Sequence, residues 1–574
     1  MTKGLNAVTF VMPCPKSGLV TAIVTQHRHR LVAQPLAVLL LLLLAICSGC
    51  SGGNWLRNGF KVGPDYCKPA APVAENWIDF NDPRVISGPI DDRAWWTVFN
   101  DPALDSLVQS TFAGNLKLAS QGQRVLEYRA IRAMYGGDLF PQFQALDGFY
   151  KRVQISEAGN IAGVPLPNRA FDLWNIGPAL QWELDVWGRF RRRLEQANAD
   201  LDKQVELYDD ILAIALAETA RAYINTRAAE EFVRLTIENV KIQKGSLELA
   251  ETRFKEGAVG ELDVTQAQST LRETTALIPL FQRDLRQANN ELCVLVGEPI
   301  TDLGSRVGNG PIPVVPVAVA VDIPGQLLRR RPDIRAAERA EASSSAEIGV
   351  AVSDLYPHFY IDGSFSWTAN QFPDMFSGQA FGGIIGPSFR WDILNYGRIR
   401  NNVRRQEARF QQAALDYQQT VLHANKEVEQ ALIAFLKAQE RAAELQLAVN
   451  ATRKSVDLAV IQYREGAIDF ERIFNLQNVL VRQQIDQARS RAEISLALIE
   501  VYRALRGGWQ IRLGPPTVVV ENVPAGVQGA GAPPTELQPP ANGQSVLPPQ
   551  AAHGQRTLPN VTTNAASLAG PAKS

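Results

Sequence analysis

The stretch Trp182-Glu183-Leu184-Asp185-Val186-Trp187-Gly188-Arg189 occurs a second time, in related form, as Trp391-Asp392-Ile393-Leu394-Asn395-Tyr396-Gly397-Arg398. In each copy an alternating, aromatic-rich run ends at a Gly-Arg pair, and a very long helical pattern follows. A similar lead-in precedes each copy, Asp138-Leu139-Phe140-Pro141 and Asp354-Leu355-Tyr356-Pro357. A unit that occurs twice determines the architecture of a chain, so we interpret this one as a tandem repeat.

The spacing between the two copies supports a duplication. The glycines at 188 and 397 lie 209 positions apart, as do those at 257 and 466, whereas the prolines at 141 and 357 lie 216 apart. The helical parts therefore keep one spacing, and the first hairpin is 7 residues longer than the second. The sequence predicts a first repeat over residues 102–310 and a second over residues 311–509. A stretch rich in Pro, Val and Gly, residues 297–325, is predicted to be the linker between the helices of the two repeats.

Ahead of each Gly-Arg pair the sequence predicts a β-hairpin, at about residues 142–185 and 358–394. Apolar and polar side chains alternate in these four strands, so each strand has one apolar and one polar face. Strands of about ten residues with this alternation are typical of transmembrane β-barrels. We expect the apolar face, with Trp182, Trp367 and Trp391, to meet lipid, since tryptophan favours the membrane interface. A soluble sandwich is disfavoured because the sequence offers no second sheet to cover that face.

After each Gly-Arg pair the apolar residues recur every three or four positions, which predicts long helices that pack along one seam. These helices span residues 189–254 and 261–296 in the first repeat, and residues 398–463 and 470–506 in the second. The longer ones would measure roughly 80–100 Å. A shorter helix opens each repeat. In the second repeat, Arg329-Arg330-Arg331-Pro332-Asp333 could bind phosphate, but we interpret it as a helix start with solvated charges.

The N-terminal segment resembles a secretory signal. Residues 27–30 are basic and residues 35–46 are almost wholly apolar, a run too short for a comfortable membrane span. Small residues precede Cys50, so we predict a signal peptide over residues 1–49 and a lipid attached to Cys50. Two alternatives stay open, attachment at Cys47 and an ordinary cleavage near Ser48. Residues 50–101 are predicted to form an extended arm, and residues 510–574, rich in Pro, Ala and Gly, a disordered tail.

Composition and motifs exclude several classes of function. A net charge of −1 argues against nucleic acid binding, and the five cysteines include no second CxxC pair that would suggest zinc. The sequence contains no nucleophile elbow, Gly-rich phosphate loop or HExxH motif, so we expect no enzyme, no metal and no cofactor. A coiled-coil scaffold would account for the helices but would leave the Trp-bearing strands unexplained.

The predicted strands require more than one chain. Four strands cannot close a barrel alone, and open sheet edges are not tolerated in lipid. Single-chain barrels begin at roughly 8 strands, so several chains must pool their strands, and three copies would supply twelve. Helices that continue from the strands would extend the lumen away from the membrane. The sequence thus predicts a mixed α and β membrane protein, in which strands pooled from several chains close a barrel that the long helices continue.

Seven motifs together resemble the outer membrane factor family of TolC-like trimeric exit ducts, in particular its lipoprotein branch, which serves resistance–nodulation–division efflux pumps. The motifs are Val62-Gly63-Pro64-Asp65-Tyr66, Leu184-Asp185-Val186-Trp187-Gly188-Arg189, Arg330-Arg331-Pro332-Asp333-Ile334, Asp354-Leu355-Tyr356-Pro357, Asp392-Ile393-Leu394-Asn395-Tyr396-Gly397-Arg398, Tyr463-Arg464-Glu465-Gly466 and Ala504-Leu505-Arg506-Gly507-Gly508-Trp509. The resemblance implies a homotrimer in the outer membrane of a Gram-negative bacterium, with a trimeric 12-stranded outer-membrane β-barrel continued by a periplasmic α-helical barrel. This trimer would work with a periplasmic adaptor and an inner-membrane pump. Its cargo would be small toxic molecules such as drugs; a protein-secretion duct is the alternative.

The resemblance also points to residues at the far end of the helices. The family's periplasmic gate follows the turn at Gly466 and includes an aspartate, whereas the matching position here is Asn475. Glu471 lies one turn earlier on the same face and would place three acidic groups near the trimer axis, which favours cations. An alternative interpretation of both residues is a solvated helix end. The candidate contacts for the adaptor lie in the two turns at the tip: Phe254, Gly257, Tyr463 and Gly466.

Overall fold

The computed structural model describes residues 52–88, 92–155 and 170–514. The chain divides into two units, residues 1–515 and 516–574, and everything below concerns the first. The predicted signal peptide, Cys50 and nearly all of the predicted tail lie outside the described residues.

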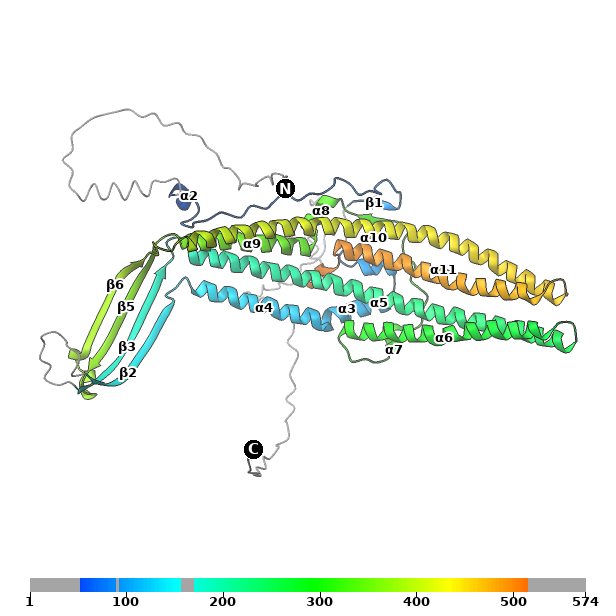
Figure 1. Ribbon diagram of the computed structural model, residues 1–574, viewed down its shortest axis with the longest axis horizontal. Coiled ribbons are helices and arrows are strands. Elements are labelled where there is room, and N and C mark those ends of the chain that lie inside the picture. Colours follow the sequence, from blue (N-terminus) through cyan, green and yellow to red (C-terminus); the bar gives the residue numbers. More distant parts are fainter. Residues whose placement is uncertain (1–51, 89–91, 156–169, 515–574) are drawn as a thin grey trace, which may run out of the picture. The chain divides into compact units, whose positions relative to one another are not determined.

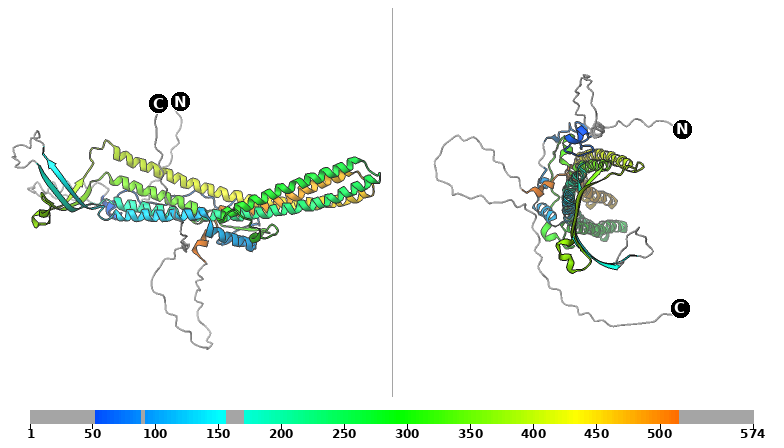
Figure 2. Two further views of the ribbon diagram at one scale, coloured as in Figure 1. Left: turned by 90° about the horizontal axis from the view of Figure 1, so that it is seen from below. Right: turned by 90° about the vertical axis from the view of Figure 1, so that its left-hand side faces the viewer.

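One antiparallel sheet contains the four predicted strands (Figure 1). These are β2 (Phe143–Gln154), β3 (Ala170–Leu184), β5 (His358–Ala369) and β6 (Phe381–Arg390), in the order β2-β3-β5-β6. Because β3 belongs to the first copy and β5 to the second, the sheet crosses the repeat boundary. An end-on view shows a curved sheet that is not closed on itself (Figure 2). The β6 strand ends at Arg390, so residues 391–394, which the sequence analysis placed in the hairpin, follow the strand.

Four long helices occur as two matched pairs. The helices α5 (Arg189–Lys255) and α10 (Arg398–Arg464) each have 67 residues, and α6 (Glu261–Val296) and α11 (Phe470–Leu505) each have 36. At 1.5 Å per residue the longer helices measure about 100 Å. Within each copy the long helix packs against its shorter successor, and α11 also contacts α5 and α6 of the first copy. The structure therefore confirms the predicted combination of four strands with long paired helices in a tandem repeat.

Glycine determines where these helices begin and turn. Gly188 and Gly397 stand directly before the two 67-residue helices with φ of 79° and 81°, and Gly257 and Gly466 turn the chain at the far end with φ of 75° and 78°. A side chain is strained in this left-handed region, and glycine is not. The same two left-handed conformations in each copy are a structural record of the duplication.

Each repeat opens with two helices where the sequence analysis expected one. In the first repeat α3 (Pro102–Gly114) is separated from α4 (Leu116–Gly137) by Asn115, whose backbone is extended and whose side chain accepts a hydrogen bond from the Leu118 amide at 3.0 Å. Asparagine favours this capping position because its side chain satisfies an amide that the new helix leaves unpaired. In the second repeat Arg331, also extended, separates α8 (Pro324–Arg330) from α9 (Pro332–Ser353).

The predicted arm and linker contain short regular elements. These are α2 (Gly52–Arg57), β1 (Val85–Ser87), η1 (Trp95–Phe99), α7 (Gly304–Val307) and β4 (Val319–Val321), with β1 and β4 paired in parallel. The β5–β6 loop holds η2 (Pro373–Phe376) and η3 (Gly378–Ala380). A last turn, η4 (Trp509–Leu513), lies where the sequence analysis began the disordered tail. The tail therefore starts no earlier than the end of this turn.

The arm contributes to the main hydrophobic core. Trp77, Trp95 and Trp96 are all buried, and they pack with α3, α5, α10 and α11. The indole nitrogen of Trp77 donates to the Asp322 carbonyl at 2.7 Å, which fixes the arm to the linker between the repeats. The arm is thus part of the folded body and not only a surface strap. Within the described residues, no helix combines the length and the apolar character needed to cross a bilayer.

Candidate functional site

The polar face of the sheet carries hydrogen bonds between neighbouring strands. Residues directly opposite each other in an antiparallel pair point to the same face. On this face the Gln181 side chain donates to Asp362 Oδ1 at 2.9 Å, Ser388 donates to the other oxygen of Asp362, and Asn175 donates to Thr368 at 2.8 Å. This face is suited to line a water-filled passage, because its polar side chains can form hydrogen bonds with water in place of those with neighbouring side chains.

The opposite face is apolar and largely uncovered in a single chain. Its aromatic and aliphatic side chains include Trp367, which is 38% exposed, and Phe389, which is 69% exposed. A soluble monomer does not leave such a patch open without a partner or a membrane. Of the other tryptophans expected here, Trp182 belongs to β3, whereas Trp391 follows β6 and donates its indole hydrogen to the Leu355 carbonyl at 3.0 Å.

The stretch at residues 182–189 forms the junction between sheet and helix. Asp185 accepts hydrogen bonds from the first amides of α5, at Phe190 (3.0 Å) and Arg191 (3.1 Å), which satisfies donors that a helix start leaves unpaired. The Trp187 ring stacks on Tyr356, with ring centroids 4.5 Å apart. These contacts support the interpretation of the stretch as a structural transition.

The arm docks against this junction through Arg192, which is 2% exposed. Its guanidinium donates to the Val62 carbonyl at 3.0 Å, to the Gly63 carbonyl at 3.2 Å and to Asp65 at 3.2 Å. Gly63, with φ of 87°, approaches α9 so closely that a Cβ on it would lie 2.5 Å from the Gly349 Cα. The motif at residues 62–66 is therefore a close-packed joint, and glycine is required there.

At the far end of the helices, all four meet in a small apolar cluster centred on Tyr463. The hydroxyl of Tyr463 donates to Asp263 at 2.9 Å, and the Arg253 guanidinium donates to the Tyr463 carbonyl and lies 4.8 Å from the ring centroid. Burial and the hydrogen bond to Asp263 raise the pKa of Tyr463 above its usual value. Arg253 and Asp263 flank one turn and Tyr463 precedes the other, so these contacts hold the two turns together.

The predicted tip residues differ in accessibility. Phe254 is 44% exposed, and the turns at Gly257 and Gly466 are open to solvent. Tyr463 is 1% exposed, so its side chain cannot present a surface to another protein and instead ties the two turns of the same chain. Glu471 and Asn475 are both exposed on α11, one turn apart on one face. Their role as a gate stays a prediction.

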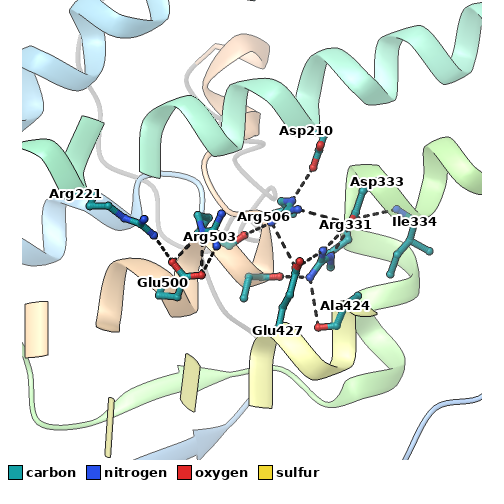
Figure 3. A network of polar contacts seen from close by, with 11 residues as sticks. Asp210, Arg221, Arg331, Asp333, Ile334, Ala424, Glu427, Glu500, Arg503 and Arg506 are labelled. Carbon is teal, nitrogen blue, oxygen red and sulfur yellow. Dashed lines mark hydrogen bonds and ion pairs between the residues drawn. The ribbon is translucent and has the colours of Figure 1, made fainter. Parts of the chain in front are cut away.

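A buried charge network joins the two repeats near the middle of the helices (Figure 3). Arg331, 1% exposed, forms ion pairs with Asp333 at 2.5 Å and with Glu427 of α10 at 2.8 Å. Arg506, which follows α11, pairs with Asp210 of α5 at 2.6 Å. The network therefore connects the start of α9, the end of α11 and both 67-residue helices.

The sequence analysis expected the charges of residues 329–333 to be solvated, and for Arg331 this expectation was wrong. Its guanidinium also donates to the Ala504 carbonyl at 2.6 Å, one of the groups that the end of α11 leaves without a helical partner. The sequence contained a signal for the burial of Arg331. Pro332 and Asp333 define the start of a helix, and the residue before that start points back into the fold. Periodicity alone does not assign such a residue to the core.

A second buried polar group lies where the arm meets α9 and α10. Glu341 is 1% exposed, and burial, with the nearby charge of Glu338, raises its pKa to about 7. Tyr66 of the arm and Tyr417 of α10 interact with it electrostatically, and the Tyr417 hydroxyl is buried without a hydrogen-bond partner in the described part of the chain.

Replacement of Glu341 by glutamine should remove a pH dependence of stability. The folded chain holds this proton more tightly than the unfolded chain does, so the contribution to stability is complete below about pH 4.5 and lost as the pH rises towards 7. We expect Glu341→Gln to match the wild type near pH 4 and to melt at a higher temperature at pH 8. Circular dichroism of the detergent-solubilised proteins measures both melting temperatures. A difference that is constant from pH 4 to pH 8 would contradict the assignment.

The remaining sequence candidates lie elsewhere. Cys50 is outside the described residues, Cys67 is exposed and Cys293 is buried. Across residues 52–88, 92–155 and 170–514, no group of histidine, cysteine and acidic side chains is arranged to hold a metal ion.

Comparison with known proteins agrees with this architecture. A family model described as outer membrane efflux protein matches residues 107–298 and 323–507, one block in each copy of the repeat. Nodulation protein T of Rhizobium leguminosarum bv. trifolii is 28% identical over 440 residues, which cover 76% of this chain and 92% of that protein. Outer membrane protein OprJ of Pseudomonas aeruginosa is 28% identical over 481 residues, 82% of this chain and 95% of that protein.

Solved structures share the fold as well. The outer-membrane channel OprN is 31% identical, superposes with a TM-score of 0.74, and covers 78% of this chain and 99% of its own. The proteins of this family are outer-membrane channels and not enzymes. Since the family model spans more than half of the sequence and follows both copies of the repeat, the chain belongs to the outer membrane efflux protein family.

Proposed function

We propose that three copies of this chain form an outer-membrane channel that passively conducts small toxic molecules, as the exit duct of a tripartite efflux system. The observation that carries the proposal is the four-stranded sheet, which has one polar face and one uncovered apolar face. Its outer strands, β2 and β6, each leave one side without a partner among the described strands. Lipid does not tolerate open edges, and four strands are too few to close. Twelve strands from three copies remove every edge.

The helices supply the other half of the duct. Large apolar side chains of α10 stay exposed although α9 and α11 pack against this helix: Leu415, Leu422, Ile433, Leu447, Leu458 and Ile461. Helices of neighbouring copies would cover them and form a periplasmic tunnel. We propose that a periplasmic adaptor and an inner-membrane resistance–nodulation–division pump dock at its tip, where Phe254, Gly257 and Gly466 are accessible.

The names of relatives favour small molecules as the cargo. Relatives in Pseudomonas putida are named an antibiotic efflux pump outer membrane protein and a toluene efflux pump outer membrane protein, each 27–28% identical. A duct for protein secretion is the second candidate, since an empty passage does not by itself select its cargo. Efflux is favoured because the lipoprotein-like Cys50 and the motif at residues 62–66 match the efflux branch of the resemblance.

Deletion of the gene tests the function. We expect the deletion strain to become more sensitive to several drugs, solvents or metals, and the intact gene to restore resistance. The purified chain should have three times the subunit mass in detergent, by native mass spectrometry. A chain that stays monomeric and soluble without detergent would exclude the channel. A normal susceptibility profile together with a missing secreted protein would favour the secretion duct.

Lipid attachment at Cys50 predicts a labelling result. Radiolabelled palmitate should enter the wild-type chain and the Cys47→Ser variant, and labelling of Cys50→Ser should fall to background, because the thioether and the amine that carry the acyl chains belong to that residue. Cys47→Ser is the matched control, three positions earlier in the same segment. Equal labelling of Cys50→Ser would refute the assignment.

The gate proposal predicts a change in conductance. Three Glu471 carboxylates near the axis would attract cations, so Glu471→Gln should reduce the preference of the channel for cations over anions in planar bilayers. Glu465→Gln, which removes the same charge from the exposed turn before α11, is the control and should leave selectivity unchanged. Equal selectivity of wild type and Glu471→Gln would show that Glu471 belongs to a solvated helix end.

A further inference from the structure

The two sheet edges that lack a partner among the described strands are β2 and β6. We propose that these edges pair with each other between copies of the chain, in a register that the internal repeat specifies and that sets Arg390 opposite Asp147 of a second copy. The proposal rests on the trimeric channel proposed above and goes beyond it, since it assigns the seam between subunits residue by residue.

The repeat operation can be read from the strand pairing. Phe143 opposes Gln181 at the start of the first hairpin, and His358 opposes Arg390 at the start of the second. Matching these pairs maps β2 onto β5 with an offset of 215 (143 to 358), and β3 onto β6 with an offset of 209 (181 to 390). The prolines before these strands lie 216 apart, because the first copy has one additional residue, Gln142, between its proline and the start of the strand. The offset of 209 also relates the glycines at 188 and 397. Adding 209 to the number of a β3 residue and subtracting 215 from that of its β5 partner therefore gives the equivalent pair between β6 of one copy and β2 of another.

The seam inside the chain is the template for the seam between copies. On the polar face of the internal seam, Gln181 opposes Asp362, and the Gln181 amide donates to the Asp362 carboxylate at 2.9 Å. At the seam between copies, Arg390 is the equivalent of Gln181, and Asp147 is the equivalent of Asp362. The acceptor is again an aspartate and the donor becomes a guanidinium, so a hydrogen bond within the chain corresponds to an ion pair between chains.

Three further positions transfer with matching size or polarity. The internal pairs and their equivalents are Trp182/Ile361 with Trp391/Leu146, Leu180/Gly363 with Phe389/Gly148, and Asn175/Thr368 with Ile384/Val153. The first keeps a tryptophan against a branched aliphatic side chain, and the second keeps a large side chain against glycine. In the third, both members change together from polar to apolar. Cross-strand pairs of this kind are the contacts that stabilise a sheet.

Other registers fit less well. A slip of one residue would set side chains of β6 that point to one side of the sheet opposite side chains of β2 that point to the other side, whereas opposed residues must share a face. A slip of two keeps the faces but sets Arg390 opposite Ala145 or Phe149, which leaves the carboxylate of Asp147 without its opposite charge. In a single chain the Arg390 side chain is 76% exposed and lies 3.5 Å from Asp392, and Asp147 is exposed on the other edge.

The proposed register also accounts for the length of β6. The β3 strand continues to Leu184, where Phe359 of β5 is its partner. The equivalent residue in the second copy is Ile393, but β6 ends at Arg390. Pairing with β2 of a second copy would supply the missing partner, Gln144, and extend β6 through Ile393. The hairpin end near residue 394 expected from the sequence would then form only in the assembly.

Disulfide cross-linking of the full-length chain in outer membranes tests the register. Opposed residues of an antiparallel pair bring their Cβ atoms within about 4.5–5.5 Å, whereas a shift of two positions separates them by about 7–8 Å. We expect Arg390→Cys with Asp147→Cys to give covalent trimers on non-reducing gels, with at least a tenfold higher yield than Arg390→Cys with Ala145→Cys or with Phe149→Cys. Each single variant measures the background from the native cysteines.

The outcomes separate the register from the channel itself. A control pair that cross-links best, or a chain of trimer mass that cross-links in none of the pairs, would overturn the register and leave the channel standing. A monomeric wild-type chain would instead overturn the channel. A second set of variants avoids cysteine: Arg390→Asp should lower the temperature at which the trimer dissociates, and Arg390→Asp with Asp147→Arg should restore it. A double variant no better than the single one would contradict the pairing.

Discussion

Replacing Arg331 by methionine is expected to lower the free energy of unfolding by about 3–5 kcal/mol, the usual cost of removing one partner from a buried ion pair. The Arg331 guanidinium is 1% exposed and neutralises Asp333 and Glu427 at once. Without it Asp333, whose side chain is 20% exposed, and Glu427, whose side chain is 40% exposed, lose the cation that they share, and the Ala504 carbonyl loses its donor. Denaturant titration of the solubilised protein, followed by circular dichroism of the helices, measures the loss.

Arg329→Met is the matched control, because Arg329 is exposed on α8 only two positions away. We expect its effect to stay within about 0.5 kcal/mol, as for most surface substitutions. If Arg331→Met and Arg329→Met cost equally little, the network does not hold the two repeats together. Loss of the trimer in Arg331→Met with an unchanged unfolding curve would place its role in assembly and not in the stability of the subunit.

Replacing Gly63 by alanine is expected to release the arm from α9. A Cβ at this position would lie 2.5 Å from the Gly349 Cα, and the φ of 87° is itself strained for alanine. Left-handed strain costs roughly 1–2 kcal/mol and overpacking typically 1–3 kcal/mol, which together approach about 2–5 kcal/mol. Because backbone meets backbone, no side chain can move aside. Limited proteolysis should cleave the arm at least tenfold faster than in the wild type.

Gly59→Ala separates strain from crowding. Gly59 has a φ of 63°, also left-handed, but a Cβ there would meet no atom within 4 Å. This control should therefore show only the smaller cost of strain and little change in proteolysis. Equal cleavage rates in the two variants would mean that the close approach of Gly63 to Gly349 contributes nothing to docking of the arm.

Much of the fold could be predicted because the same pattern of strands and helices occurs twice in the sequence. The constant offset of 209 between the two pairs of glycines fixed the helix ends, and those glycines do adopt left-handed conformations at both ends of α5 and α10. The period changes from two to three and a half at each Gly-Arg pair, and in the structure each 67-residue helix begins at the arginine of that pair. Patterns that are local and repeated are the ones that sequence periodicity resolves.

The parts that could not be predicted depend on contacts between distant segments. Trp77, Trp95 and Trp96 lie in a stretch without periodicity, yet their large apolar surfaces are buried against helices hundreds of residues away. The break at Asn115 was missed because an asparagine inside an apolar period does not identify itself as a cap. Each of these features is decided by what the side chain meets in the folded chain.

The candidate site shows the same limit. Tyr463 precedes a surface turn by three residues, so proximity suggested an exposed contact, but the aromatic ring is large enough to fill the space between four helices and is buried there. The roles proposed for Cys50, Glu471 and Asn475 involve lipid or neighbouring copies. Residues whose environment is completed by another molecule cannot be assigned from the pattern of one chain.

The equal lengths of the paired helices restrict how this duct can change during evolution. One residue inserted in α5 alone would move its turn by about 1.5 Å and rotate everything beyond it by about 100°. Arg253 would then no longer reach the Tyr463 carbonyl across the tip. The apolar side chains of neighbouring helices stay opposite each other only if the helices change length by about seven residues at a time. The change must be made in all four long helices together. The length of such a duct can therefore change only in steps of whole heptads, and the same step must occur in both copies of the repeat.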